Sequence, residues 1–262
     1  MTNVPGQGGG VAFARVAREM KGNDGVLVAA SPSTLLGLAQ GHYGTMTERD
    51  VRWIAAVATE PSVLAVGPAS TWRSFDAFVA AWRANPASVV FGGGSVIGGQ
   101  DHMKVLLLAR AAGVELRNVR YIALSGPYEA IDSLRTGGIH LFPGDMSEVR
   151  RFAERNDLRL LALLSDRRAT GAFAQVPTAR ERGIEVTWEV WRGFYAPTEI
   201  SAMAYDAWVK RLRAMSETAA WKTLLERNGL TPYFSAGREF EQFVQSQTAS
   251  FRTVSHEIGI DR

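Results

Sequence analysis

The segment Phe91-Gly92-Gly93-Gly94-Ser95-Val96-Ile97-Gly98-Gly99-Gln100-Asp101-His102 connects a short strand-like run, Val89–Phe91, to a strongly apolar helical run, Gln100–Ala112. Glycine costs ordering entropy, so this many glycines in one connection indicate a backbone that approaches another group closely or adopts a positive φ. The first free amides of the following helix favour an anion. We therefore expect this turn to hold a carboxylate or a phosphate, with a tight turn that binds nothing as the alternative.

The spacing of this segment excludes two nucleotide-binding motifs. A Walker A loop needs Lys-Ser or Lys-Thr after its last glycine, and Gly98-Gly99 is followed by Gln100. A dinucleotide-binding fingerprint would need its third glycine at the position of Ile97. A nucleotide cofactor is therefore not expected, and the sequence suggests no other cofactor.

Alternating strand and helix patterns extend on both sides of this segment. The sequence predicts strands at Val26–Ala30, Trp53–Ala58, Ser62–Val66, Val89–Phe91, Val119–Leu124, Ile139–Phe142 and Leu158–Leu164. Between them it predicts helices at Val11–Met20, Phe75–Ala84, Gln100–Ala112, Tyr128–Leu134 and Glu148–Arg155. This alternation is typical of an α/β fold with parallel sheets covered by helices on both faces. The last third is expected to be almost entirely helical, over Ala202–Met215, Ala220–Asn228 and Arg238–Ile258.

Two further polar turns follow predicted strands. They are Ser125-Gly126-Pro127-Tyr128-Glu129 and Ser31-Pro32-Ser33-Thr34. In an open α/β sheet, ligands bind beyond the carboxyl ends of the strands, where all three turns would lie. Together they favour a binding site, although each one alone also fits a simple helix cap.

Composition excludes several classes of function. The 262 residues are 46% hydrophobic and 21% charged, which suits a globular chain of two lobes. The net charge of +3, from 29 basic and 26 acidic side chains, lacks the clustered basic surface of a nucleic-acid-binding protein. No apolar run reaches the roughly 20 residues of a membrane-spanning helix. The chain has no cysteine, and its four histidines form no i,i+4 pair, so no metal site is expected.

A catalytic interpretation has little support. Ser95, Asp101 and His102 are residue types of a hydrolase triad, but Ser95 lacks a Gly-x-Ser-x-Gly elbow, and two consecutive residues point to different faces of a helix. A hydrolase or transferase that uses Ser95 and His102 remains an alternative to a binding protein. A second alternative is the ligand-sensing module of a regulator, although no DNA-binding segment is present. Asp145 and Glu148 form either a carboxylate pair or a cap for the helix near Ser147.

Several motifs occur in an order that resembles one protein family. They are Thr2-Asn3-Val4-Pro5-Gly6-Gln7-Gly8-Gly9, the glycine-rich segment through His102, Val119-Arg120-Tyr121-Ile122-Ala123 with Ser125-Gly126 and Glu129-Ala130, and Val176-Pro177-Thr178 followed by Trp191-Arg192-Gly193. This ordered set resembles the substrate-binding proteins of tripartite tricarboxylate transporters, the TctC or Bug-type periplasmic receptors. The resemblance runs from Thr2 to about Ile260.

The resemblance implies a two-lobed type II periplasmic-binding-protein fold, the Venus-flytrap fold, without enzymatic activity. It implies an extracytoplasmic, periplasmic receptor that holds a small di- or tricarboxylate between its lobes and passes it to membrane permease subunits. A monomer is expected. In such receptors backbone amides, hydroxyls and water hold the carboxylates. The ligand contacts expected here are Ser33, Ser95, Gly99, Gln100, Ser125, Gly126 and Asp145.

The family pattern also suggests how the chain is divided. Receptors of this type begin with a signal peptide and a strand, helix and strand that precede the Asn-x-Pro-Gly segment, whereas this sequence begins at that segment. Lobe 1 is therefore expected to lack its first strand, helix and strand, and no signal peptide is expected in the sequence. The predicted division assigns residues 1–92 and 194–262 to lobe 1 and residues 93–193 to lobe 2.

Overall fold

The structure, a computed structural model, describes residues 1–260, which form two compact units. Unit 1 combines the chain up to Thr59 with the segment from Trp191 onward, and unit 2 is Glu60–Val190. The sequence placed the first crossover near Gly92, whereas the structure places it between Thr59 and Glu60. The physical reason is that residues 62–66 pair with a strand of unit 2. These residues and the segment that follows them therefore belong to unit 2.

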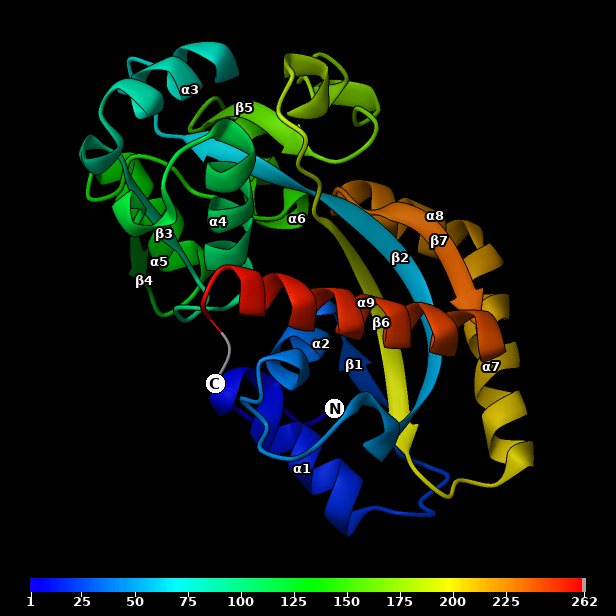
Figure 1. Ribbon diagram of the computed structural model, residues 1–262. Coiled ribbons are helices and arrows are strands. Elements are labelled where there is room, and N and C mark those ends of the chain that lie inside the picture. The colour runs from blue at the N-terminus through cyan, green and yellow to red at the C-terminus, as the bar shows by residue number, and fades with distance from the viewer. Residues whose placement is uncertain (261–262) are drawn as a thin grey trace. The chain divides into compact units, whose positions relative to one another are not determined.

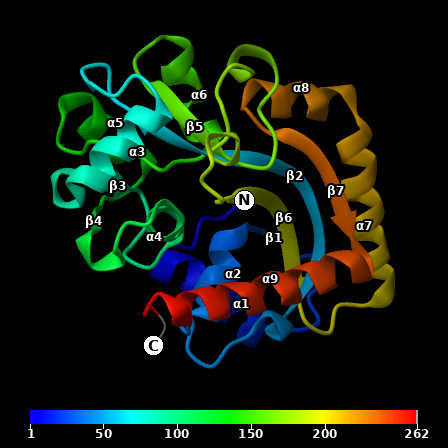
Figure 2. The ribbon, with the colours of Figure 1, turned by 45° about the horizontal axis from the view of Figure 1, so that its top comes forward.

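Unit 1 is built on a sheet covered by helices (Figure 1). Its strands are β1 (Val28–Ala30), β6 (Glu189–Pro197), β2 (Val51–Val66) and β7 (Thr231–Ala236). β1 pairs antiparallel with β6, and β7 pairs antiparallel with β2. Its helices are α1 (Gly10–Glu19), α2 (Pro32–Ala39), α7 (Ala202–Glu217), α8 (Ala219–Arg227) and α9 (Gly237–Glu257). α9 packs on α2, while α7 and α8 lie along β7, as Figures 1 and 2 show.

The core of unit 1 is aromatic. Trp53 of β2 meets Trp191 of β6 edge to face, with ring centroids 6.1 Å apart. Phe240 of α9 packs on both indoles, 6.2 Å from Trp53 and 5.4 Å from Trp191. All three side chains are buried, and edge-to-face pairs of this kind add to the free energy gained by burial. The helix α9 is thereby held on the sheet.

Unit 2 places two parallel strands beside its helices. β3 (Val90–Gly93) pairs in parallel with β4 (Arg120–Ala123), and the second half of β2 pairs antiparallel with β5 (Arg159–Leu164). Its helices are α3 (Phe75–Ala84), α4 (Gln100–Ala112), α5 (Pro127–Thr136) and α6 (Met146–Glu154). α4 and α5 both pack against β3. Single 3-10 turns in the chain are Gln7–Gly9, Glu48–Asp50, Pro86–Ser88, Leu116–Asn118, Gly171–Phe173 and Arg180–Arg182.

The α/β class is confirmed, but the expectation of parallel sheets was wrong for most pairings. Within residues 1–260, β1 with β6, β2 with β5 and β2 with β7 are antiparallel, and β3 with β4 is parallel. The two strands predicted at Trp53–Ala58 and Ser62–Val66 are one continuous strand, β2. Residues 139–142 form isolated bridges to Phe91 and Ala65 instead of a strand. The strand β7 was not predicted, because its sequence, Thr-Pro-Tyr-Phe-Ser-Ala, contains no continuous apolar run.

Local signals fixed the helices of unit 2 more reliably. α3 has the predicted bounds because Ser74 Oγ accepts a hydrogen bond from the backbone N of Ala77 at 3.2 Å and caps the helix. Its buried residues Phe75, Phe78 and Trp82 recur at helical spacing and face the core. α4 also has the predicted bounds, because Gly113 ends it in the left-handed conformation.

We expect Gly193→Ala to destabilise the protein. A Cβ at Gly193 of β6 would lie 2.6 Å from the carbonyl oxygen of Ala55 and 3.0 Å from the Cα of Ala56, both backbone atoms of β2. The strands would have to separate, which costs about 1–3 kcal/mol by analogy with overpacked cores. Urea unfolding measures the loss. Gly25→Ala is the control, because its Cβ would contact only Asn23 Oδ1 at 3.5 Å. Equal stability of both variants would contradict the prediction.

Candidate functional site

The two glycine-containing turns of unit 2 lie against each other. The first turn, Gly94–Gly99, leaves β3 and enters α4, and the second turn, Leu124–Gly126, leaves β4 and enters α5. Because β3 and β4 are parallel, their carboxyl ends share one edge. A Cβ at Gly94 would lie 2.6 Å from backbone atoms of Gly126 and Pro127. The structure therefore places the turn that carries Ser95 and Gly99 against the turn that carries Ser125 and Gly126.

Ser95 caps the helix that follows the first turn. Its Oγ accepts a hydrogen bond from the backbone N of Asp101 at 2.9 Å. The Tyr121 hydroxyl of β4 donates to the carbonyl oxygen of Ser95 at 2.9 Å and lies 3.3 Å from its Oγ. The hydroxyl of Ser95 thus takes one amide of the α4 amino terminus and joins the first turn to β4.

Gly99 is required by close packing. Its φ of −72° is one that any residue adopts. A Cβ there would lie 2.9 Å from Ser95 Cβ and 2.9 Å from the Val96 carbonyl oxygen, which leaves no room for a side chain. Val96 and Ile97, by contrast, are 59% and 66% exposed. The turn therefore presents apolar side chains to solvent at the amino terminus of α4.

His102 is held as a neutral imidazole. Its Nδ1 accepts from the backbone N of Gly98 at 3.0 Å, and its ring lies 4.7 Å from the ring of Tyr121. Burial lowers the pKa of His102 to about 4. No hydrogen bond joins His102 to Ser95 within residues 1–260, and an imidazole of so low a pKa is a weak general base near pH 7. The geometry argues against the hydrolase alternative.

The second turn holds a carboxylate of its own chain. The backbone N of Ser125 donates to Glu129 Oε2 at 2.6 Å. Hydrogen bonds from the backbone and then the side chain of Ser125 lower the pKa of Glu129. Ser125 is exposed, and a Cβ at Gly126 would meet nothing within 4 Å. This turn is therefore open, and the backbone N and the side chain of Ser125 are already hydrogen-bonded to Glu129.

Lys104, which the sequence analysis did not select, is fully buried one turn into α4. Its Nζ donates to Asp145 Oδ1 at 2.7 Å, to the Pro143 carbonyl oxygen at 3.0 Å and to Asp101 Oδ1 at 3.1 Å. Burial alone would lower the pKa of Lys104, but Asp145 and Asp101 outweigh it, and the pKa is raised. The i,i+3 spacing of Asp101 and Lys104 is a sequence signal that could have indicated this ion pair.

Asp145 is bound inside unit 2 through its carboxylate. It is 2% exposed, and besides Lys104 its carboxylate accepts from Ser62 Oγ at 3.0 Å and from Gln100 Nε2 at 3.0 Å. It also forms a capping box with Glu148 at the start of α6. The structure thus favours the cap over the ligand contact for Asp145. The side chain of Gln100 is likewise turned into the interior.

Glu148 and Glu60 complete this polar cluster. Glu148 Oε2 accepts from the backbone N of Asp145 at 2.9 Å, and Glu60 Oε2 accepts from the backbone N of Ser147 at 2.8 Å. Burial, followed by the charges of Asp145 and Asp101, raises the pKa of Glu148 to about 8. We call Lys104, Asp101, Asp145, Gln100, Ser62, Glu148 and Glu60 the buried polar cluster.

Ser33 belongs to unit 1. It is the second residue of α2, after the cap position Ser31, and is half-buried. The other predicted contacts all belong to unit 2. Ser33 therefore stays a prediction.

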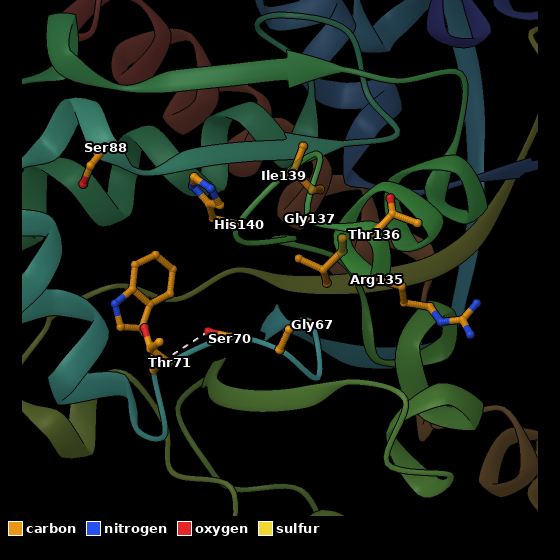
Figure 3. Close-up of a pocket in the computed structure, with 12 residues that line it drawn as sticks. Gly67, Ser70, Thr71, Ser88, Arg135, Thr136, Gly137, Ile139 and His140 are labelled. Atoms are coloured by element: carbon orange, nitrogen blue, oxygen red, sulfur yellow. Dashed lines mark hydrogen bonds between the residues drawn. The ribbon is translucent and has the colours of Figure 1, made fainter.

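A separate pocket of about 450 Å³ lies in unit 2, at the end of α5 remote from Gly126. Figure 3 shows Ser70, Thr71, Thr136 and His140 around it. Several of its polar groups have internal partners: Thr136 Oγ1 donates to the Asp132 carbonyl oxygen, and His140 Nδ1 accepts from the backbone N of Val90. None of the predicted contacts lines this pocket, whose lining is Gly67, Ala69, Ser70, Thr71, Trp72, Ser88, Leu134, Arg135, Thr136, Gly137, Ile139 and His140.

The described part of the chain has neither a metal-binding cluster nor a membrane-spanning helix. Within residues 1–260, no group of three or more His, Asp or Glu side chains is arranged to hold a metal ion. Among the helices of the same range, none has the length and hydropathy needed to cross a bilayer.

Comparisons with known proteins identify the class of this α/β protein. A model described as "Tripartite tricarboxylate transporter family receptor" matches residues 1–260. The chain belongs to this family, which consists of receptors and not of enzymes. The resemblance predicted from the sequence motifs is thus confirmed.

Individual relatives agree with the family assignment. BugT of Bordetella pertussis is 26% identical over 207 residues, which are 79% of this chain and 62% of BugT. The chain thus spans less than two thirds of the length of this relative. MatC of Rhodopseudomonas palustris, solved with bound malate, has a TM-score of 0.78 at 19% identity, covering 95% of this chain and 85% of MatC. An R. palustris protein solved with adipate has a TM-score of 0.85 at 19% identity, with coverages of 98% and 85%. These structures show a shared fold.

We expect Glu148 to contribute stability that is lost as pH rises from about 4.5 to about 8, while the lowered pKa of His102 gives a slope of the opposite sign below about pH 6.5. The raised pKa of Glu148 means that the folded state binds a proton that the unfolded state has released in this range. Glu148→Gln stays uncharged and keeps an oxygen for the backbone N of Asp145. Its stability should therefore depend less on pH.

Urea unfolding at several pH values between 5 and 8 measures this dependence. Glu154→Gln is the matched control, because Glu154 lies on the same helix, is partly exposed and pairs with Arg150 at 2.8 Å. The control should keep the wild-type slope. A wild-type slope in Glu148→Gln would contradict the assignment of the proton to Glu148.

Proposed function

We propose that this protein is an extracytoplasmic solute receptor that binds a small di- or tricarboxylate at the first and second turns of unit 2. The observation that carries the proposal is the contact between these turns at the carboxyl ends of β3 and β4, where Gly94 lies against Gly126. Strand-end turns of this kind are the usual ligand positions in open α/β folds. The amino termini of α4 and α5 begin there, and helix amino termini favour anions.

The comparisons support the same chemistry. MatC binds malate and a second R. palustris protein binds adipate, and both share the fold of this chain. Both ligands are dicarboxylates of small size. Ser95, Gly99 and the backbone of Gln100 on the first turn, and Ser125 and Gly126 on the second, are the proposed contacts in unit 2, with Ser33 as a proposed contact from unit 1. Asp145 and the side chain of Gln100 are buried and hydrogen-bonded to each other, so they are not among the proposed contacts.

The physiological context follows from the family. As a receptor of the tripartite tricarboxylate transporter family, the protein is proposed to act in the periplasm as a monomer and to deliver its ligand to membrane permease subunits. Backbone amides and hydroxyls would recognise the carboxylate, so the choice among ligands depends on the space around the turns and on ordered water.

A thermal-shift screen tests the ligand class. Malate, adipate and citrate are added to the protein, with a sugar and a divalent cation as comparison ligands. A ligand that binds only the folded state stabilises it by about 2.7 kcal/mol at a hundredfold excess over its dissociation constant. A rise in the melting midpoint with a carboxylate is expected. A rise with the sugar or the cation and with no carboxylate would overturn the proposal.

We expect Gly99→Val to weaken binding of the best carboxylate by at least about tenfold, or about 1.4 kcal/mol. The valine Cβ would meet Ser95 Cβ and the Val96 carbonyl oxygen at 2.9 Å, so the first turn has to move. The fold should survive, because this turn lies at the surface of unit 2. Calorimetric titration measures the affinity, and a melting curve measures the fold.

Thr71→Trp is the control for this variant. Thr71 is exposed and lines the separate pocket of Figure 3, so a tryptophan there would fill that pocket and leave the first turn unchanged. Its carboxylate affinity should match that of the wild type. Loss of binding in Thr71→Trp, with normal binding in Gly99→Val, would move the site to the pocket.

A further inference from the structure

A buried lysine in the first turns of α4 needs a physical explanation. Lys104 is 0% exposed, and its neighbours Met103, Val105 and Leu108 on the same helix are buried apolar residues. Removing an ammonium from water costs several kcal/mol, and apolar residues of similar volume often replace buried ion pairs without loss of stability. Overall stability therefore does not account for a lysine at this position. The contacts of Lys104 show which parts of unit 2 it holds together.

The contacts of Asp101 lead from Lys104 to the first turn. Lys104 Nζ donates to Asp101 Oδ1 at 3.1 Å, and the backbone N–H of Gly94 donates to the same carboxylate. The backbone N of Asp101 in turn donates to Ser95 Oγ at 2.9 Å. Asp101 thus holds both residues at the start of the first turn. A Cβ at Gly93 would lie 2.7 Å from Asp101 Oδ2, so the carboxylate also lies directly against the end of β3.

The contacts of Asp145 lead from Lys104 to the rest of unit 2. Lys104 Nζ donates to Asp145 Oδ1 and to the Pro143 carbonyl oxygen. This segment is fixed to β2, because the backbone N of Val63 donates to the Gly144 carbonyl oxygen at 2.9 Å. The three N–H groups of the ammonium therefore have three acceptors on two segments. One of these segments carries the first turn, and the other is anchored in the sheet.

We propose that Lys104 is a positioning residue for ligand binding, which fixes the first turn by holding Asp101 against Gly94 and tying it to Asp145. The inference rests on the proposed function, because the first turn is the proposed carboxylate site. Lys104 itself does not touch the ligand. Without its ammonium, the carboxylates of Asp101 and Asp145 would lose the cation that joins them, and Asp101 would no longer be held in place against the Gly94 amide.

Lys104→Met tests the proposal, since methionine keeps much of the volume and removes the charge. Calorimetric titration with malate and adipate should show an affinity lower by about tenfold or more, as expected for losing charge-assisted hydrogen bonds. Hydrogen exchange of the Gly94 amide, followed by NMR, should become faster. Amides of unit 1, such as that of Gly37, should exchange as in the wild type.

Leu108→Ala is the matched control. Leu108 is buried on the same helix, one turn beyond Lys104, so its truncation lowers the melting midpoint without touching the buried polar cluster. It should keep the wild-type affinity and the slow exchange of Gly94. Equal losses of affinity in Leu108→Ala and Lys104→Met would show that Lys104 acts only through stability, which overturns the proposal. Wild-type affinity in Lys104→Met overturns it as well.

A second variant covers the case in which Lys104→Met does not fold. Asp101→Asn leaves Lys104 paired with Asp145, so no charge is left alone in the interior. It should reduce malate and adipate affinity several-fold and speed exchange at Gly94, and a wild-type result for both would refute the proposal. The exchange measurement needs no ligand. If the wild type binds no carboxylate, the proposed function fails, while Gly94 exchange still shows whether Lys104 fixes the turn.

Discussion

The strand β2 supplies backbone hydrogen-bonding groups to both compact units, and much of the structure depends on it. Its first part pairs with β7 in unit 1, and its last part pairs with β5 in unit 2. A strand that is covered over this length has to be apolar nearly throughout, and most of its sixteen residues are buried. Its two buried polar residues, Glu60 and Ser62, lie where the chain enters unit 2. Both have partners, in Ser147 and Asp145, so these two buried side chains are hydrogen-bonded where the chain crosses between the units.

Those partners connect the crossover strand to the proposed ligand site. Asp145 accepts from Ser62 on one side and from Lys104 and Gln100 of α4 on the other. The amino terminus of α4 is the first turn. Two carboxylates, Asp101 and Asp145, face the single ammonium of Lys104, so the buried polar cluster offers no excess positive charge to an anion. A ligand carboxylate at this turn would therefore be bound by hydrogen bonds from backbone amides and hydroxyls.

The sequence predicted what local chemistry determines and missed what distant contacts determine. α3 and α4 have their predicted bounds, because Ser74 and Gly113 mark the ends with side-chain and left-handed caps. The meeting of the two glycine turns was predictable from strand order. The direction of strand pairing was not predictable, since β2 pairs with β5 and β7, which lie far from it in sequence. Lys104 was missed because a single lysine in an apolar helix is expected to be solvent-exposed. The buried partners of Asp145 were missed because they lie far from it in sequence.

The two turns of the proposed site differ in what they leave for a ligand. At the second turn Glu129 already accepts from the backbone N of Ser125, which shows that the turn accommodates a carboxylate. A ligand carboxylate that reached Ser125 would have to displace Glu129, so it would gain only the difference between two similar hydrogen bonds. At the first turn Ser95 Oγ accepts from the backbone N of Asp101 and lies 3.3 Å from the Tyr121 hydroxyl, so a ligand there would not have to displace a carboxylate from Ser95, and the exposed Val96 and Ile97 offer apolar contact. The binding free energy should therefore come mainly from the first turn, which is the turn that the buried lysine holds in place.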